Sequence, residues 1–179
     1  LAAAFRILEQ VRLAPDTQIA ILGDGKLGLL AAWAARSAGA RVALIGKHHA
    51  KLALAGADIE TIHLDQSTEI GRRFDIVADC TGSSTGLPTA LSLVRPCGTV
   101  VLKTTIAGDY LTNLAPIVID ELTIVGSRCG PFPRAIAALA THEIDVLPLI
   151  GDVYSIDDAE AAFGAAAQRG AKKIILSVN

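Results

Sequence analysis

"ILGDGKLGLL", residues 21–30, places glycines at positions 23, 25 and 28 directly after an apolar run. The residues before it, "TQIAIL" (17–22), have the composition of a short buried strand. After it, apolar side chains recur at a helical period as far as Gly39, which is a helix stop signal. The sequence therefore predicts a strand, a glycine-rich turn and a helix in succession.

The three glycines fit the pattern G-x-G-x-x-G, which is weak alone and much stronger between a strand and a helix. Gly23 permits the tight turn, Gly25 lets a diphosphate approach the backbone, and Gly28 lets the helix pack closely on the strand. The amides of Lys26 and Leu27, at the helix N-terminus, would hold the anion with help from the helix dipole. We expect the pyrophosphate of a dinucleotide here, with an ordinary turn as the alternative.

Short β-rich runs alternate with helical stretches along the chain, which predicts parallel strands joined by crossover helices. The strands read as continuous Val, Ile and Leu because parallel strands are buried on both faces. We expect an α/β fold, an open, doubly wound parallel sheet of the Rossmann type with about six strands and helices on both faces. The expected strands cover residues 17–23, 41–46, 59–64, 74–82, 98–105 and 121–130.

The composition bounds the class of protein. The chain has 179 residues, 51% of them hydrophobic, which argues against disorder. With a net charge of −2 and scattered Lys and Arg, neither nucleic acid nor a membrane surface is an expected partner. The cysteines are three in number and far apart (Cys80, Cys97 and Cys129), so they favour neither a disulfide framework nor a metal clip. A reducing, cytoplasmic location is the expectation.

The end of the second strand bears on which dinucleotide is bound. A carboxylate there would bind the ribose hydroxyls of NAD, but the chain has Gly46 followed by Lys47 and His48, with Lys51 close by. A small residue and cations suit the 2′-phosphate of NADP, so we favour NADP over NAD; a solvated basic loop is the alternative. Adjacent histidines, His48 and His49, are poorly placed to share a metal ion, and we expect no metal site.

Other strand ends carry further candidates. Thr81 and Gly82 are expected to line the cofactor, whereas Cys80 reads as a small core residue rather than a nucleophile. Arg128 could lower the pKa of the neighbouring Cys129. A structural or cofactor-lining role for Cys129 is still preferred to catalysis, since no His is near it in the sequence.

Five segments stand out by their order and spacing: "AILGDGKLGLL", "DCTGS", "GTVVLKTT", "LTIVGSRCGPF" and "GAKKIILSV". In these segments the sequence resembles the cofactor-binding half of zinc-type medium-chain alcohol dehydrogenases. The likeness extends over essentially the whole chain and is nearest to the sorbitol- and glucose-dehydrogenase-like branch. It implies oxidation of an alcohol, or reduction of a carbonyl, by hydride transfer to or from a nicotinamide cofactor.

The resemblance also implies roles for single residues. The turn from Gly23 to Gly28 would bind the pyrophosphate, and Lys173 would reach back to it. The remaining roles follow by position: Gly46, Lys47 and His48 at the adenosine ribose or its phosphate, Thr81 and Gly82 on the adenosine side, and Thr104, Ser127, Arg128 and Cys129 at the nicotinamide carboxamide.

The departures from the family pattern are as informative. Nothing in the chain corresponds to the family's N-terminal domain with its active-site zinc, and the sequence cannot assemble the three protein ligands that a catalytic zinc needs. We expect an excised cofactor-binding domain that is inactive alone, with a natural fragment as the alternative. Residues 1–155 would form the Rossmann domain with a leading helix, and 156–179 a helix and strand that pack on the missing domain. A homodimer through the sheet edge at 121–127 is also expected.

Two other classes of protein use a similar fold. A non-catalytic nucleotide sensor would usually keep an acid after the second strand and lack the segment "GSRCGPF". A methyltransferase that binds adenosylmethionine would want an acid at the same strand end for the ribose, so Gly46 disfavours it. Titration with NADPH, NADH and adenosylmethionine separates the three readings.

Overall fold

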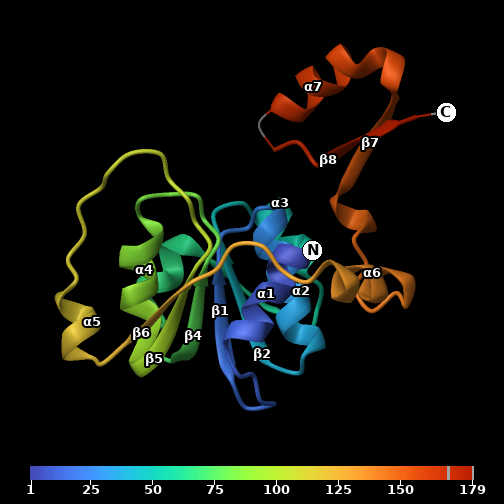
Figure 1. Cartoon of the computed structure of the whole chain (residues 1–179). Coiled ribbons are helices and arrows are strands. Elements are labelled where there is room, and N and C mark those ends of the chain that lie inside the picture. Colours follow the sequence, from blue (N-terminus) through green and yellow to red (C-terminus); the bar gives the residue numbers. More distant parts are fainter. Residues whose placement is uncertain (169, 179) are drawn as a thin grey trace. The chain divides into compact units, whose positions relative to one another are not determined.

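The computed structural model describes residues 1–168 and 170–178. The chain divides into two compact units, Leu1–Ile144 and Asp145–Asn179, which Figure 1 colours from blue to red along the sequence. The sequence suggested a division after residue 155 instead. The strand β7 (Ile150–Ser155) pairs with β8 (Lys173–Ser177), and it therefore belongs with the second unit.

The first unit contains a six-stranded sheet in the order β3-β2-β1-β4-β5-β6, and every neighbouring pair is parallel. The order reverses between β1 and β4, the two central strands. This confirms the doubly wound parallel fold that the alternation of strands and helices predicted. The strands are β1 (Gln18–Leu22), β2 (Arg41–Gly46), β3 (Glu60–His63), β4 (Phe74–Asp79), β5 (Val94–Leu102) and β6 (Thr123–Gly126).

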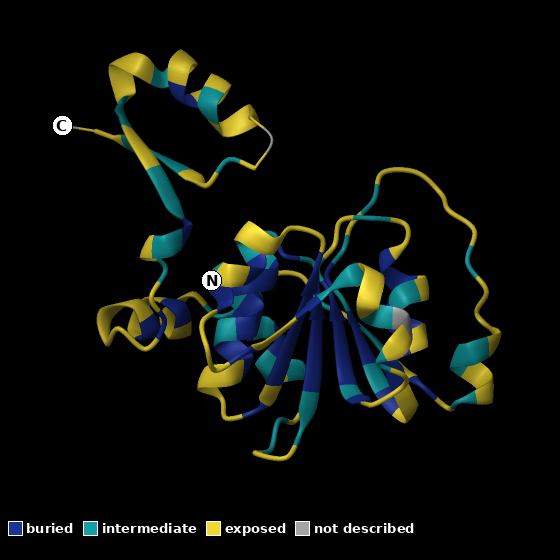
Figure 2. Cartoon of the chain, turned by 180° about the vertical axis from the view of Figure 1, so that it is seen from behind, coloured by how far each residue is buried: buried dark blue, intermediate teal, exposed yellow. Residues whose placement is uncertain are grey.

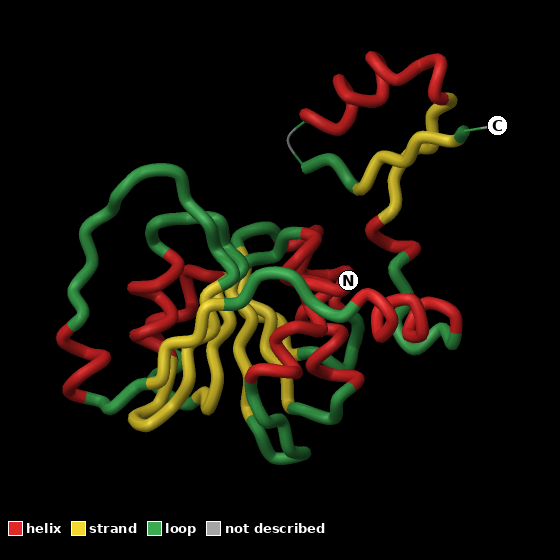
Figure 3. Tube along the Cα trace, in the orientation of Figure 1, coloured by secondary structure: helices red, strands yellow, loops and turns green. Residues whose placement is uncertain are grey.

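Helices cover both faces of this sheet. Figures 1 and 3 show α4 on one side of the strands and α1 and α2 on the other. The helices are α1 (Ala2–Gln10), α2 (Lys26–Ser37), α3 (His49–Leu52), α4 (Gly86–Leu93), α5 (Ala115–Ile119) and α6 (Phe132–Ala140), with 3-10 turns η1 (Ala53–Ala55) and η2 (Leu64–Glu69).

The core lies between the helices and the central strands, which are dark blue in Figure 2. From Ile19 to Leu22 every residue of β1 is at most 1% exposed, and Val77 of β4 is fully buried. Burying one such side chain stabilises the fold by about 1.5–3 kcal/mol. The buried face of α2 consists mainly of alanines and Leu29, so this helix can pack closely on the sheet.

The second unit is a two-stranded parallel sheet, β7 and β8, with α7 (Ala159–Ala167) packed against both strands. Its remaining elements are the 3-10 turns η3 (Leu147–Leu149) and η4 (Ile156–Asp158). The expected final helix and strand are therefore present, together with β7, which the sequence did not predict. Phe163 of α7 is 71% exposed. Whether this unit packs on a further domain stays a prediction.

None of the helices in the described ranges is both long and apolar enough to cross a bilayer.

Candidate functional site

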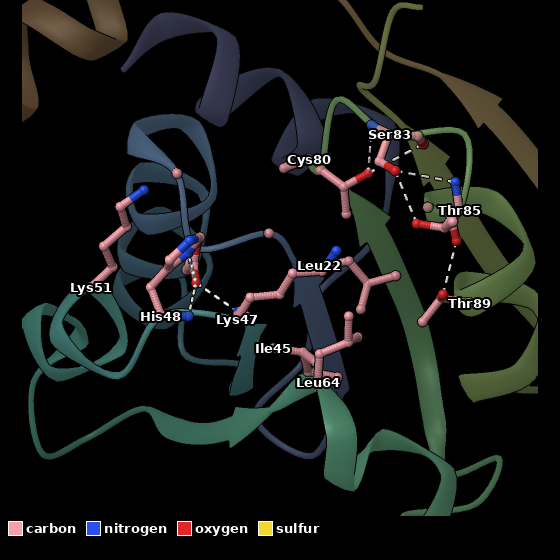
Figure 4. A pocket seen from close by; sticks show the side chains of 16 residues that line it. Leu22, Ile45, Lys47, His48, Lys51, Leu64, Cys80, Ser83, Thr85 and Thr89 are labelled. Carbon is pink, nitrogen blue, oxygen red and sulfur yellow. Dashed lines mark hydrogen bonds and ion pairs between the residues drawn. The ribbon is translucent and has the colours of Figure 1, made fainter. Parts of the chain in front are cut away.

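A cavity of about 280 Å³ opens at the carboxyl ends of β1, β2 and β4, beside the point where the strand order reverses. Open parallel sheets bind ligands at this position. Figure 4 shows Lys47, His48 and Lys51 on one side, Ser83, Thr85 and Thr89 on the other, and apolar side chains between them. Among the residues predicted from the sequence, Gly23, Gly25, Gly46, Lys47, His48 and Thr81 line this cavity.

The glycine-rich turn has the geometry that the motif predicts. Gly23 has a φ of +104°, and a Cβ there would lie 2.8 Å from the carbonyl oxygen of Cys80. A Cβ at Gly28 would overlap the carbonyl oxygen of Gly23, so only glycine fits. Gly25 is the N-cap of α2 and has open space where a Cβ would stand. The turn therefore leaves room for a ligand directly above the N-terminus of α2, where Lys26 and Leu27 begin the helix.

Asp24, inside the glycine motif, is a site residue that the sequence analysis left without a role. It is 6% exposed, and its Oδ2 accepts hydrogen bonds from the backbone N–H groups of Lys47 and His48, both at 2.7 Å. The His48 Nδ1 lies 3.0 Å from both carboxylate oxygens. Burial raises the pKa of Asp24, but the hydrogen bonds from His48 and Lys47 outweigh burial and hold it below its ordinary value. Asp24 thus ties the loop after β2 to the loop after β1.

This contact changes the interpretation of Gly46. A Cβ at position 46 would lie 2.5 Å from Asp24 Oδ2, so the carboxylate of Asp24 occupies the space that a side chain at Gly46 would need. A carboxylate is therefore present at this end of the sheet, although it comes from the turn after β1 and not from β2. The end of β2 gives no sign of this acid in the sequence, because the two positions are far apart in the chain.

The cations around the cavity differ in their partners. Lys47 and Lys51 line the cavity, and in Figure 4 the side chain of Lys47 extends across it. His48 is turned toward Asp24. His49 does not line the cavity and stacks on His63, with ring centroids 4.7 Å apart. The lysines that line the cavity are thus Lys47 and Lys51.

A second buried carboxylate, Asp79, organises the end of β4. It is 1% exposed, and its Oδ1 accepts hydrogen bonds from the Thr81 N–H (2.9 Å), the Thr81 hydroxyl (2.7 Å) and the Thr104 hydroxyl (2.8 Å). The Thr104 Oγ1 in turn accepts a hydrogen bond from the Gly82 N–H at 3.0 Å. Three predicted site residues, Thr81, Gly82 and Thr104, therefore meet around one carboxylate that the sequence analysis did not single out.

The ends of β5 and β6 meet at Lys103, which directly follows β5. Its Nζ donates hydrogen bonds to the Ser127 Oγ at 2.9 Å and to the Arg128 carbonyl oxygen at 3.2 Å. Cys129 is exposed. Cys80 is of intermediate exposure and lines the cavity, so it is not the small core residue that the sequence suggested. Burial of its thiol nevertheless raises the pKa to about 12 and leaves it a poor nucleophile, as expected.

Several cavity residues carried no signal in the sequence. Leu22, Ile45 and Leu64 form its apolar part, and the hydroxyls of Ser83, Thr85 and Thr89 its polar wall. The Ser83 Oγ and Thr85 Oγ1 are 2.9 Å apart, and the Thr89 hydroxyl donates to the Thr85 carbonyl oxygen at 2.8 Å. Only the fold brings these residues to the side of the cavity opposite Lys47.

Two expectations concern a residue of the second unit and a metal site. Lys173 is the first residue of β8 and lies in the second unit, so its approach to a pyrophosphate stays a prediction. The described residues contain no group of three or more His, Cys, Asp or Glu side chains that could hold a metal ion. The described residues therefore offer no ligand set that fits a zinc ion.

The family model for zinc-binding dehydrogenases matches residues 27–143, which include most of the sheet and both sides of the cavity. The chain belongs to the zinc-binding dehydrogenase family. The resemblance that the motifs carry is thereby confirmed.

The curated relatives of this chain include polyol dehydrogenases. The chain is 30% identical to L-idonate 5-dehydrogenase of Vitis vinifera, over 95% of this chain and 52% of that protein. It is 27% identical to D-xylulose reductase A of Aspergillus oryzae, over 100% of this chain and 55% of that protein. The chain thus spans about half the length of the curated relatives it matches.

Solved structures agree with the fold. A zinc-binding dehydrogenase from Sinorhizobium meliloti 1021, solved bound to NADP, superposes with a TM-score of 0.87 at 26% identity, over 98% of this chain and 56% of that one. L-Idonate 5-dehydrogenase from Escherichia coli superposes with the same TM-score of 0.87 at 24% identity, over 98% of this chain and 54% of that one. The second similarity supports the fold alone.

Proposed function

We propose that this chain is the nicotinamide-dinucleotide-binding domain of an alcohol or polyol dehydrogenase. The observation that carries the proposal is the glycine-rich turn, where Gly28 is required by packing while the space above Gly25 is open at the N-terminus of α2. Helix N-termini bind phosphate groups through N–H groups and the helix dipole. The family and the polyol dehydrogenases among its relatives support the same assignment.

In this proposal each side of the cavity binds one part of the cofactor. The turn at Gly23–Gly28 binds the pyrophosphate, and Leu22, Ile45 and Leu64 provide an apolar surface for the adenine. The bound cofactor supplies hydride chemistry, accepting a hydride from an alcohol or donating one to a carbonyl. Thr104 and the segment at Ser127–Cys129 hold the nicotinamide carboxamide, at the ends of β5 and β6.

NADP is the preferred cofactor in this proposal. Lys47 and Lys51 line the cavity at the end of β2, where a 2′-phosphate would lie, and no side chain stands at Gly46. The carboxylate of Asp24 opposes this preference, but two backbone N–H groups and His48 already bind it. The 26% identical dehydrogenase from Sinorhizobium meliloti was solved with NADP. NAD remains the alternative.

The substrate and the assembly are proposals about the whole protein. We expect a small-molecule alcohol or carbonyl as substrate, with the zinc held in a catalytic domain outside residues 1–179, and no turnover by this chain alone. A cytoplasmic location suits its three free cysteines. We also expect a homodimer through residues 121–127, since β6 is an edge strand. Sedimentation of the protein as a monomer at high concentration would remove the dimer from the proposal.

The test is calorimetric titration of the protein with NADPH, NADH and adenosylmethionine. We expect NADPH to bind most tightly and adenosylmethionine not to bind. Gly25→Ala is the informative variant, because its methyl group meets no protein atom within 4 Å and would still obstruct a pyrophosphate. We expect it to fold and to lose roughly tenfold or more in NADPH affinity.

Gly164→Ala is the matched control, since a Cβ there also meets nothing within 4 Å. It should leave NADPH affinity unchanged. Binding of adenosylmethionine in preference to NADPH, or an unaltered affinity in Gly25→Ala, would contradict the proposed function.

A further inference from the structure

Lys103 is a buried cation at the end of the sheet where a dinucleotide would end. Only 8% of it is exposed, and its ammonium group donates to the Ser127 hydroxyl and the Arg128 carbonyl, both of which follow β6. Its backbone N–H donates to the Asp79 carbonyl of β4 at 3.0 Å. One lysine therefore touches the carboxyl ends of three adjacent strands.

The charge of Lys103 has no carboxylate partner in residues 1–168 and 170–178. The Oδ1 of the nearby buried carboxylate, Asp79, accepts hydrogen bonds from the hydroxyls of Thr81 and Thr104 instead. Burial lowers the pKa of Lys103, and Arg6 acts in the same direction, whereas Cys80 and Cys129 raise it. The two groups that the amine contacts are a hydroxyl and a carbonyl oxygen, and acceptors of this kind suit an ammonium donor. Burying a cation without a counterion costs free energy of folding. A lysine at this position therefore suggests a functional role.

The fold indicates which end of the cofactor comes near Lys103. A doubly wound sheet binds a dinucleotide across the point where the strand order reverses, here between β1 and β4. The pyrophosphate lies at the first helix N-terminus and the adenosine ribose near the end of β2. The nicotinamide half must then extend over the ends of β4, β5 and β6. Lys103, Ser127 and Arg128 lie at those ends.

The two redox forms of the cofactor differ in charge at this end. The oxidised nicotinamide ring carries a positive charge and the reduced ring does not. When an alcohol is oxidised, its carbon gives up a hydride, its hydroxyl gives up a proton, and the positive charge of the cofactor is lost. A fixed cation in a poorly solvated position therefore destabilises the oxidised form relative to the reduced one.

We propose that Lys103 is a specificity-determining residue that makes the site bind NADPH more tightly than NADP⁺. This inference rests on the proposed function and adds to it. Because the reduced form is stabilised on the protein, the same cation favours acceptance of a hydride from the alcohol. If Lys103 served only to connect β5 and β6 through its hydrogen bonds, it would not change the affinity for NADPH relative to that for NADP⁺.

The experiment compares Kd values for NADPH and NADP⁺, each titrated separately into the protein and three variants. Lys103→Met removes the charge and keeps most of the length of the side chain. Lys103→Gln also removes the charge but keeps a donor for Ser127 and Arg128, so it provides the measurement if methionine is not tolerated. Lys103→Arg keeps the charge and changes the shape of the side chain. Thermal unfolding checks that each variant is folded.

We expect the wild-type protein to bind NADPH more tightly than NADP⁺. In Lys103→Met and Lys103→Gln the ratio of Kd for NADP⁺ to Kd for NADPH should fall roughly tenfold, while Lys103→Arg, which keeps the charge, retains the wild-type ratio. If both uncharged variants weaken the two forms equally and leave the ratio unchanged, the inference is overturned and the proposed function stands. If the wild-type protein binds neither form, both are overturned.

Discussion

At the scale of single residues, the main finding is that Asp24 and Gly46 depend on each other. Gly46 reads in the sequence as space for a phosphate, whereas in the structure the carboxylate of Asp24 fills that space. The amides of Lys47 and His48 bind the same carboxylate. The role of a residue in the glycine motif is thus set by a strand end more than twenty residues away in the chain.

A double-mutant cycle tests this dependence. Gly46→Ala should lower the free energy of unfolding by about 1–3 kcal/mol, because its methyl group collides with Asp24. In an Asp24→Gly background the same substitution should cost much less, since the colliding atoms are gone. Urea denaturation of the four proteins measures the coupling. Equal costs in the two backgrounds would contradict the contact.

The lowered pKa of Asp24 predicts a pH dependence. A carboxyl group whose pKa is lower in the folded state stabilises the fold above its unfolded pKa of about 3.9, and this contribution is lost as the pH falls through the folded value. We expect Asp24→Asn to reduce the loss of stability between about pH 5 and pH 3. Asp58→Asn is the control, because the side chain of Asp58 is 80% exposed. Identical pH profiles for wild type and Asp24→Asn would refute this.

The cysteines should differ in reactivity. Cys97 and Cys129 are exposed, whereas burial raises the pKa of the Cys80 thiol to about 12. At pH 8, iodoacetamide should therefore modify Cys97 and Cys129 quickly and Cys80 only after unfolding. Peptide mass spectrometry at timed intervals follows each site. Early modification of Cys80 in the folded protein would count against the burial of its thiol.

At the scale of elements, all six strands of the large sheet could be predicted from the sequence, whereas the start of β5 and the strand β7 could not. β1, β2 and β4 are continuous apolar runs because both their faces are buried, so their composition alone identifies them. β5 begins at Val94, although the sequence suggested residue 98, because Arg95, Pro96 and Cys97 are exposed and give no apolar signal. β7 has no apolar pattern and is defined by its pairing with β8, a tertiary contact.

The same limit applies to the site. The glycine turn is local in sequence, and its geometry followed from the motif. Asp79 and Lys103 are polar residues at the ends of apolar strands, and their importance arises only when neighbouring strands bring Thr81, Thr104 and Ser127 to them. Sequence reasoning identified the strand ends as the site but could not identify which polar side chain would be buried among them.

At the scale of the whole molecule, the two units raise the question of what the second contributes. Lys173 begins β8 in this unit, and the family resemblance assigns it to the pyrophosphate. If that assignment holds, Lys173→Ala should weaken NADPH binding roughly fivefold to tenfold, because one charge-assisted contact to a phosphate is lost. Lys172→Ala is the neighbouring control. Equal NADPH affinities in wild type and Lys173→Ala would limit the pyrophosphate site to the first unit.

The interlock of Asp24 with Gly46 constrains any redesign of coenzyme preference. An NAD-dependent variant could be sought by placing a glutamate at position 46, at the end of the second strand. In this protein the new carboxylate would lie against that of Asp24, and the two negative charges would repel each other. A successful conversion would need Asp24 to be replaced by a smaller residue in the same variant. Related proteins that changed coenzyme during evolution should likewise have substituted positions 24 and 46 together.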